Sequence, residues 1–324
     1  MKKKIALITG IGGQDGSYLA EFLLKKNYKV FGILPRRSNP EFQTYRIEEI
    51  INKLTIVYGD ILDKLTLDDI ISKIKPHEIY HLAAQSHVGV SFKSPFITTQ
   101  IDYVGVINIL DSIRTNSPKS KFYNASTSEI YGNANKILMI NEKSEKDPVS
   151  PYGISKLAAY YLTKVYRDSY NIFACNGILF NHESPRRGLN FVTAKIVKGA
   201  LEIKHKKRKK IELGYLDSKR DWGHAKDYVK AMWLMLQQNK PEDYVIATGK
   251  SKSVRDVCKI VFKKLNLGDY KKYIKINKRY LRPNELYHLK GNATKAKRNL
   301  RWKPEISFEE MIDEMIIKLE ERFF

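Results

Sequence analysis

The sequence predicts an α/β fold of the Rossmann type, a doubly wound parallel sheet, with a smaller α/β domain towards the C-terminus. Two observations support this prediction. Short apolar runs alternate with amphipathic helical segments between Ile5 and Leu179, as in a parallel sheet covered on both faces. Three evenly spaced glycines, Gly10, Gly13 and Gly16, join the first apolar run to the first helical segment. We expect a first domain at residues 1–180, with a return segment near 221–250, and a second domain mainly at 181–324.

The expected elements follow in strict alternation. Strands are predicted at Ile5–Thr9, Val30–Leu34, Leu54–Tyr58, Glu78–Leu82, Lys121–Ala125 and Phe173–Leu179, and helices at Ser17–Leu24, Ile97–Thr115 and Tyr152–Tyr170. Residues 181–188 are polar and predict a loop. A helix at Ala225–Gln238 and a short strand at Tyr244–Ala247 follow.

The chain is strongly basic, with 58 Lys and Arg against 35 Asp and Glu and a formal net charge of +23. The basic residues are spread over nearly every predicted helix, and the dense run at 204–210 is interpreted as a solvated loop between a helix and a strand. Specific nucleic-acid binding favours a basic stripe interleaved with aromatic residues. We therefore expect no specific nucleic-acid partner.

The lengths of the apolar runs and the positions of the two cysteines indicate where the protein is located and whether it binds a metal. The apolar run behind the first lysines ends at Thr9, which is too short for a signal peptide, and no later run approaches membrane-spanning length. Cys175 and Cys258 show no CxxC spacing and no neighbouring histidine pair, so we expect both to be thiols in the core. We expect a cytoplasmic protein with no membrane partner and no metal site.

The glycine turn predicts a dinucleotide site. Glycines allow a tight turn and let a pyrophosphate approach the helix N-terminus, where free N–H groups favour an anion. The second strand ends in Arg36 and Arg37 where an NAD enzyme commonly has an acid, which favours the extra phosphate of NADP. Asp60 follows the third strand near the expected adenine, and the small residues after Leu82 allow the backbone to approach the cofactor.

Two further segments carry candidate catalytic groups. Glu129 lies just past the end of the fifth strand, and on position alone it is either a helix-start carboxylate or a general acid/base. Tyr152 and Lys156 lie one helical turn apart, so the ammonium is expected to lower the pKa of the phenol. The same spacing recurs at 160/164 and 215/219, interpreted as ordinary helix or loop surface, but only Tyr152 follows prolines that set a helix start.

Together these motifs resemble the extended short-chain dehydrogenase/reductase family, and within it the enzymes that dehydrate nucleotide sugars. The resemblance covers almost the whole chain, and its most specific stretches are residues 181–188 (NHESPRRG) and 220–224 (RDWGH). The chain departs from the family at Gly12, where relatives usually have threonine, and at Pro35, which is inserted before the double arginine.

The resemblance implies dehydration of GDP-mannose to GDP-4-keto-6-deoxy-mannose, towards GDP-6-deoxyhexoses such as GDP-fucose or GDP-rhamnose. It implies oxidation at carbon 4, loss of water across carbons 5 and 6, and reduction at carbon 6, with NADP+ recycled in each turnover. Tyr152 then takes the hydroxyl proton, Thr127 hydrogen-bonds the oxygen at carbon 4, and Glu129 is the acid/base of the elimination. Lys156 holds the nicotinamide ribose and tunes Tyr152.

The resemblance also implies the binding residues. Those expected to contact NADP are Gly10, Gly13, Gln14, Asp15, Gly16, Arg36, Arg37, Asp60, Ile61, Leu82, Ala83, Ala84, Ser86, Tyr152, Lys156, His182 and Arg187. Those expected around the sugar nucleotide are Ser86, Thr127, Asn181, Lys195, Arg220, Arg282 and Glu285. Arg36 and Arg37 are alternatives for the 2′-phosphate. Because the segment after this double arginine reaches a neighbouring subunit in the family, a homodimer or homotetramer is expected.

Three other functions are compatible with these sequence features. Another nucleotide-sugar 4,6-dehydratase or a 4-epimerase would share the fold, although an epimerase needs no elimination acid, so Glu129 speaks against it. A non-catalytic NADP-binding regulatory protein would not be expected to keep Tyr152, Lys156, Thr127 and Glu129 together.

Overall fold

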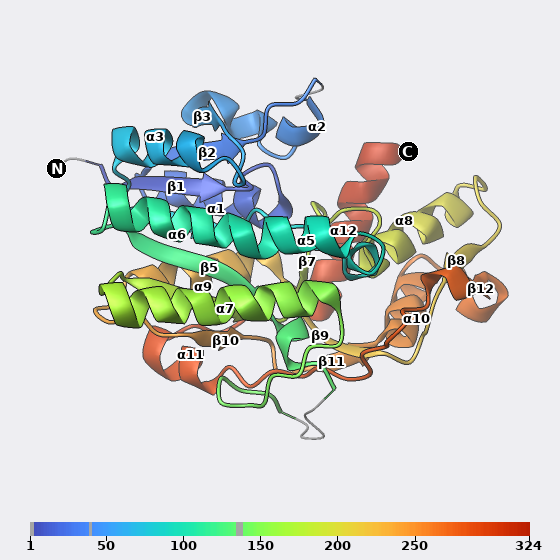
Figure 1. Cartoon of the computed structure of the whole chain (residues 1–324). Coiled ribbons are helices and arrows are strands. Elements are labelled where there is room, and N and C mark those ends of the chain that lie inside the picture. The colour runs from blue at the N-terminus through green and yellow to red at the C-terminus, as the bar shows by residue number, and fades with distance from the viewer. Residues whose placement is uncertain (1–2, 39–40, 134–138) are drawn as a thin grey trace.

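The protein is organised around a parallel sheet of seven strands. A computed structural model describes residues 3–38, 41–133 and 139–324. The strand order is β10 (Tyr244–Ile246), β6 (Ala174–Leu179), β5 (Lys121–Thr127), β4 (Glu78–His81), β1 (Ile5–Thr9), β2 (Lys29–Leu34) and β3 (Thr55–Tyr58), and all neighbouring pairs are parallel. The chain runs outward from β1 through β2 to β3 and then returns to β4 on the other side of β1 (Figure 1). The predicted Rossmann-type fold is therefore confirmed.

Helices cover both faces of this sheet because successive strand residues point to opposite sides. On one face, α3 (Lys64–Ile74), α6 (Gly105–Asn116) and α7 (Pro151–Tyr170) pack on Leu7, Ile79 and Phe122. On the other face, α1 (Gln14–Lys25) and α9 (Ala225–Leu236) pack on Ala6 and Ile8. Figure 1 shows α6 and α7 in front of the sheet and α9 behind it.

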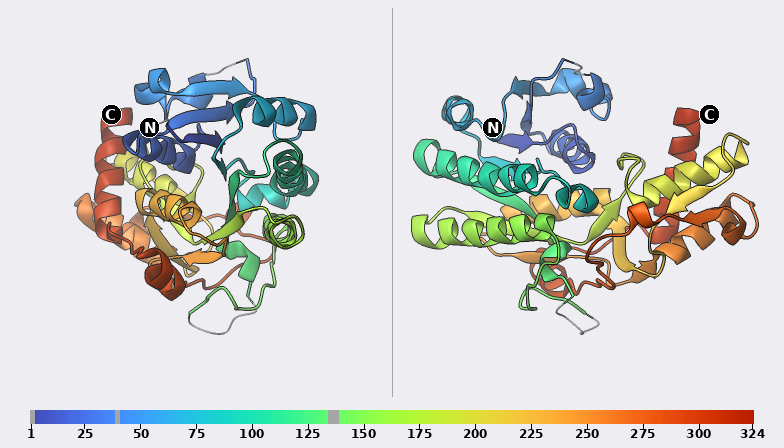
Figure 2. Two further views of the ribbon diagram at one scale, coloured as in Figure 1. Left: turned by 90° about the vertical axis from the view of Figure 1, so that its left-hand side faces the viewer. Right: turned by 45° about the vertical axis from the view of Figure 1, so that its right-hand side comes forward.

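A second hydrophobic core lies beyond the carboxyl edge of the sheet, on the right in Figure 1. It joins α8 (Val192–Lys204), α10 (Val254–Lys264) and α12 (Phe308–Phe323) with the parallel pair β8 (Ile211–Leu213) and β12 (Ile274–Ile276). A three-stranded sheet of β11 (Ser251–Ser253), β9 (Lys219–His224) and β7 (Asn181–Glu183) connects the two parts of the molecule. Figure 2 shows the helices of this second part standing apart from the seven-stranded sheet.

Short helices complete the described chain. The α-helices are α2 (Glu41–Thr44), α4 (Val88–Ser91), α5 (Pro95–Thr99) and α11 (Thr294–Leu300), and the 3₁₀ segments are η1 (Glu48–Lys53), η3 (Ser128–Tyr131), η4 (Tyr270–Lys272) and η5 (Lys278–Tyr280). One π-helical turn, η2 (Gln100–Val104), lies between α5 and α6.

Several predicted boundaries differ from the structure. The helix predicted at residues 97–115 is interrupted by η2, and β5 continues two residues past its predicted end, to Thr127. The segment 181–188, predicted as a loop, begins with β7, because its backbone pairs with β9 of the second part, a partner that local sequence does not reveal. The basic run lies between α8 and β8, and residues 205–210 are exposed, as predicted. Cys175 and Cys258 are buried, which confirms them as core thiols.

Candidate active site

A large cavity of about 1430 Å³ lies where the carboxyl ends of the strands meet the second part of the molecule. Every candidate binding or catalytic residue named from the sequence lines this cavity, with the exception of Arg36. Arg37 lines the cavity beside Pro35, so the structure favours Arg37 over Arg36 at the end of β2.

The glycine turn is shaped to receive an anion. Gly10 has a φ of +71°, and a Cβ on Gly16 would lie 2.3 Å from the carbonyl oxygen of Gly10. Gly13 caps α1 without a side chain, so the first N–H groups of the helix face an uncovered surface. The residues present therefore fit the pyrophosphate of a dinucleotide. A Cβ at Gly12 would lie 2.0 Å from the carbonyl oxygen of Gln43, which explains why this chain has no threonine there.

Glu129 is held at the start of η3. The Thr127 side chain caps this short helix and accepts a hydrogen bond from the Glu129 N–H at 3.3 Å. The carboxylate lies in the cavity with 7% exposure, and both of its oxygens face Nη1 of Arg282, at 3.3 and 3.4 Å. The position of Glu129 is compatible with both interpretations from the sequence, a helix-start carboxylate and a general acid/base, since it lies in the first turn of a helix and also lines the candidate site.

Tyr152 and Lys156 lie in the first two turns of α7. Lys156 is buried, and its ammonium donates to the carbonyl oxygen of Ala125 at 3.1 Å. Burial raises the pKa of the Tyr152 phenol well above its usual range, with a smaller contribution from the Asp102 carboxylate, and hydrogen bonding to Thr127 opposes the shift. This direction is opposite to the lowering expected from the Tyr–Lys spacing, because burial is the largest influence on the pKa of Tyr152.

Asp102 is a buried carboxylate that acts electrostatically on Tyr152 and Lys156, and the sequence interpretation missed it. It is fully buried in the π-helical turn η2, a type of turn that often occurs at functional sites. Its Oδ1 accepts the Gln85 N–H at 2.8 Å, while Oδ2 has no hydrogen-bond partner among the described residues. Burial raises the pKa of Asp102 to about 6, and the Lys156 ammonium opposes that rise. The sequence carried no clear signal, because other polar residues, such as Gln100 and Asp111, occur in the same predicted helix.

This raised pKa predicts a stability effect of one substitution. Between pH 3.8 and about 6 the native carboxyl binds more protons than the unfolded one, so stability falls as the pH rises through that range. The cost of the charged form is on the order of 3 kcal/mol above pH 6. We expect Asp102→Asn to be more stable than the parent at pH 8, with a gain about half as large at pH 5, in urea unfolding. A gain that does not change with pH, or a loss at both values, contradicts this account.

His182 and Asp15 form a half-buried pair on the cofactor side of the cavity. His182 Nε2 lies 2.7 Å from Asp15 Oδ2, and the histidine ring stacks on Tyr228 with centroids 4.5 Å apart. Burial opposes both charges, but the mutual attraction prevails, so the pKa of His182 is raised and that of Asp15 is lowered. Asp15 lies in the first turn of α1, so this pair fixes β7 against the glycine turn.

The opposite side of the cavity is rich in cations. Arg220 is 5% exposed, lies 3.8 Å from the Glu285 carboxylate, and has its pKa lowered to about 10 by burial. Arg282 pairs with Glu129, and Lys195 lies over the ring of Tyr280 at 3.4 Å. These positive groups surround a space beside the catalytic candidates, which suits a substrate carrying phosphates.

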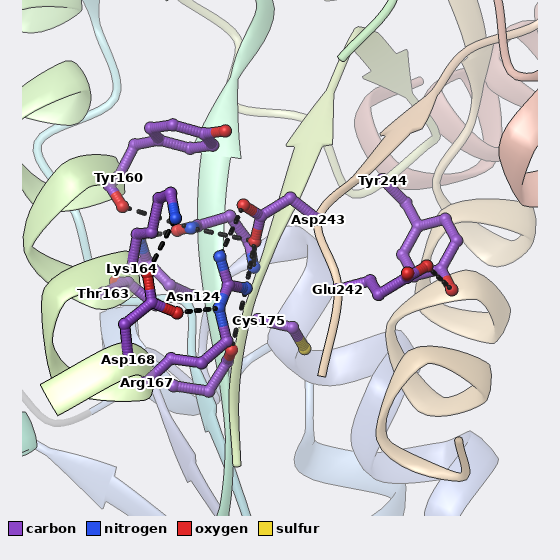
Figure 3. A network of polar contacts seen from close by, with 12 residues as sticks. Asn124, Tyr160, Thr163, Lys164, Arg167, Asp168, Cys175, Glu242, Asp243 and Tyr244 are labelled. Carbon is purple, nitrogen blue, oxygen red and sulfur yellow. Dashed lines mark hydrogen bonds and ion pairs between the residues drawn. The ribbon is translucent and has the colours of Figure 1, made fainter. Parts of the chain in front are cut away.

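A buried polar network ties α7 to the sheet (Figure 3). Asp243, which precedes β10, accepts hydrogen bonds from Arg167 Nη1 at 2.8 Å and from Arg167 Nη2 at 3.1 Å. It also accepts the Asn176 N–H at 2.8 Å, and Asn176 in turn accepts from Asn124 on β5 at 2.9 Å. Tyr160 belongs to this network through its carbonyl oxygen and is buried, which corrects its assignment to surface. The network holds the helix that carries Tyr152 and Lys156.

Two other kinds of site are not found. In the described ranges, no three His, Cys, Asp or Glu side chains are grouped so that they could hold a metal ion. None of the helices in the part of the chain that the structure describes is long and apolar enough to cross a membrane.

The fold and the site define an extended short-chain dehydrogenase/reductase. Solved structures of other proteins share this fold, and two of them are similar to this chain over nearly its whole length. dTDP-glucose 4,6-dehydratase from Bacillus anthracis, solved in complex with NAD, has a TM-score of 0.85 and 24% identity, with 98% of this chain and 97% of that chain covered. RMD from Pseudomonas aeruginosa, complexed with NADPH, has a TM-score of 0.83 and 22% identity, with 99% and 100% covered.

Sequence comparison identifies the family within this class. The model of the family described as GDP-mannose 4,6 dehydratase matches residues 7–315. The GDP-mannose 4,6 dehydratase of Drosophila melanogaster is 48% identical over 97% of this chain and 86% of its own length. The chain belongs to the GDP-mannose 4,6-dehydratase family.

Proposed function

We propose that this protein removes water from GDP-D-mannose to give GDP-4-keto-6-deoxy-D-mannose. The observation that carries the proposal is the presence of Glu129 in the same cavity as Tyr152 and Lys156. A Tyr–Lys pair alone suits the oxidation of an alcohol, and a carboxylate beside it adds the acid/base group that an elimination requires. The product is a starting point for 6-deoxyhexoses such as those of GDP-fucose and GDP-rhamnose.

We assign Tyr152, Thr127 and Glu129 to different atoms of the sugar. Tyr152 accepts the proton of the hydroxyl at carbon 4, while Thr127 hydrogen-bonds the oxygen of that hydroxyl. Once carbon 4 is a ketone, the proton at carbon 5 is acidic, and Glu129 removes it and passes a proton to the hydroxyl that leaves carbon 6 as water. When carbon 6 is later reduced, a proton is added back at carbon 5. Arg220 and Arg282 bind the diphosphate and thereby orient the sugar towards these residues.

A nicotinamide cofactor fits the glycine turn, and we propose that it is NADP. When bound, NADP+ accepts a hydride from carbon 4 and returns it to carbon 6. Gly10, Gly13 and Gly16 admit its pyrophosphate, and Arg37 at the end of β2 is placed for the 2′-phosphate. Lys156 holds the nicotinamide ribose.

This assignment predicts that Arg37→Ala loses most of the preference for NADP. A charge-assisted contact to phosphate contributes roughly 1.5–3 kcal/mol, so the affinity for NADP should fall at least about tenfold while that for NAD changes little. Calorimetric titration of both cofactors measures the two affinities, and Arg36→Ala is the matched control. Equal losses for the two cofactors, or a larger loss in the control, would move the phosphate contact away from Arg37.

We also propose a homodimer or homotetramer, formed through the segment that follows the double arginine. Most of this segment is described, but residues 39–40 lie outside the described ranges. Sedimentation equilibrium gives the mass directly, and a monomer at micromolar concentration would contradict the proposal.

Incubation with GDP-mannose and NADP+, followed by mass and NMR analysis of the sugar, tests the reaction itself. A product lighter by one water, with a ketone at carbon 4 and a methyl group at carbon 6, is expected. A product of unchanged mass with inverted carbon 4 would indicate an epimerase. Unchanged substrate would indicate a non-catalytic protein.

A further inference from the structure

The ion pair between Glu129 and Arg282 joins two groups to which the proposed reaction assigns different partners. Glu129 is fixed by the Thr127 cap at the end of β5, whereas Arg282 lies on the segment after η5, 153 residues further along the chain. Nη1 of Arg282 lies 3.3 and 3.4 Å from the two carboxylate oxygens. Both oxygens are therefore turned towards the same guanidinium nitrogen, which draws the carboxylate towards Arg282.

The charges around this pair are balanced. Arg220 faces Glu285 at 3.8 Å, and the Glu129 carboxylate is the main charge that favours ionised Arg220. Two guanidinium groups and two carboxylates thus form one cluster without excess charge. A diphosphate brought into the cluster needs cationic partners. Lys195 and Arg279 also line the cavity, and the two arginines paired with carboxylates can join them only by weakening those pairs.

Arg282 is better placed than Arg220 to change partners. Its side chain is 27% exposed, whereas that of Arg220 is 6% exposed. Arginine also binds phosphate with two parallel charge-assisted hydrogen bonds, which a single Nη1 shared between two carboxylate oxygens does not provide. A bound diphosphate therefore offers Arg282 a stronger partner than Glu129.

We propose that Arg282 is a positioning residue that holds Glu129 in the free protein and releases it when the diphosphate of a nucleotide sugar binds. The inference rests on the proposed function and extends it. A sugar that lacks the diphosphate leaves Glu129 paired, so Arg282 selects substrates at the elimination step as well as at binding. The carboxylate is exposed to the sugar only when the nucleotide is in place.

GDP is the probe that tests this exchange, because it carries the diphosphate and cannot react. Isothermal titration is performed on the parent, Glu129→Gln, Arg282→Ala and the double variant. Without the competing carboxylate, Glu129→Gln should bind GDP about tenfold more tightly than the parent. In the Arg282→Ala background the same change should alter the affinity less than about twofold.

Glu285→Gln is the matched control, because it removes one negative charge from the same cavity but its ion-pair partner is Arg220. Its effect on GDP affinity should be the same with and without Arg282. An unchanged affinity in Glu129→Gln, or an equal gain in both backgrounds, would overturn the exchange and indicate simple charge repulsion. A parent protein that turns over GDP-mannose but shows no coupling refutes only this inference. A parent that neither binds GDP nor turns over GDP-mannose refutes the proposed function as well.

A crystal structure of the parent with GDP decides the question if Arg282→Ala binds too weakly to titrate. The guanidinium should contact the diphosphate and lie beyond salt-bridge distance from Glu129. An intact Glu129–Arg282 pair beside bound GDP would exclude the exchange.

Discussion

Replacing Glu129 by glutamine is expected to slow turnover of GDP-mannose by about 10²–10⁴-fold, the usual contribution of a general acid/base group. The amide keeps the size and the hydrogen bonding of the side chain but cannot take the proton from carbon 5. Oxidation at carbon 4 does not use this carboxylate, so reduced cofactor should still form on the protein. Exchange of the hydrogen at carbon 5 with solvent deuterium should nearly stop.

Tyr152→Phe is the matched comparison, because it removes only the phenolic oxygen from the same cavity. This variant should fail one step earlier, with bound NADP+ left unreduced in the presence of GDP-mannose. Cofactor absorbance and deuterium content of the recovered sugar distinguish the two failures. If Glu129→Gln turns over at close to the parent rate, Glu129 is a helix-start carboxylate and the elimination needs another base.

Asp243→Ala is expected to lower the free energy of unfolding by about 3–5 kcal/mol, as for other buried ion pairs that lose one partner. The substitution leaves the Arg167 side chain, 13% exposed, without its close carboxylate partner, and among the described residues only the exposed Asp168 remains, at 3.6 Å. It also removes the acceptor of the Asn176 N–H beside β10. Urea unfolding at pH 7 measures the change. Activity of the folded fraction should fall as well, because α7 carries Tyr152 and Lys156.

Asp168→Ala is the control for this prediction, since Asp168 lies on the same helix and its close partner is Lys164 at 2.7 Å, whereas Arg167 lies 3.6 Å away (Figure 3). That pair is about half exposed on both sides, and exposed pairs contribute only about 0.3–0.5 kcal/mol. Similar losses in the two variants would mean that the buried network has no special role in holding α7.

The fold could be predicted from the sequence because its signals are local. Apolar runs of strand length, helical periodicity and the glycine turn each depend on neighbours in the chain, and these gave the sheet and the cofactor side of the cavity. Glu129 and Tyr152 could be predicted because each follows a recognisable strand end or helix start. The choice between Arg36 and Arg37 shows the limit of this approach, since the sequence left both open and only the structure shows that Arg37 lines the cavity.

Features that depend on contacts between distant segments were not predictable. The pairing of β7 with β9 and the Glu129–Arg282 ion pair each join residues far apart in the sequence. The direction of the Tyr152 pKa shift was also missed, because burial is a property of the whole fold and is the largest cause of that shift. Asp102 was missed for the same reason, since an aspartate within a helix is usually solvent-exposed.

The measurement that tests the central claim most directly follows the hydrogen of carbon 4. GDP-mannose carrying deuterium at that carbon is incubated with the protein and NADP+ in ordinary water, and the product is examined by NMR. The proposed reaction predicts GDP-4-keto-6-deoxy-mannose with the deuterium in the methyl group at carbon 6 and no net reduction of NADP+. Deuterium retained at carbon 4 of an inverted sugar, or a product without deuterium at carbon 6, would contradict it.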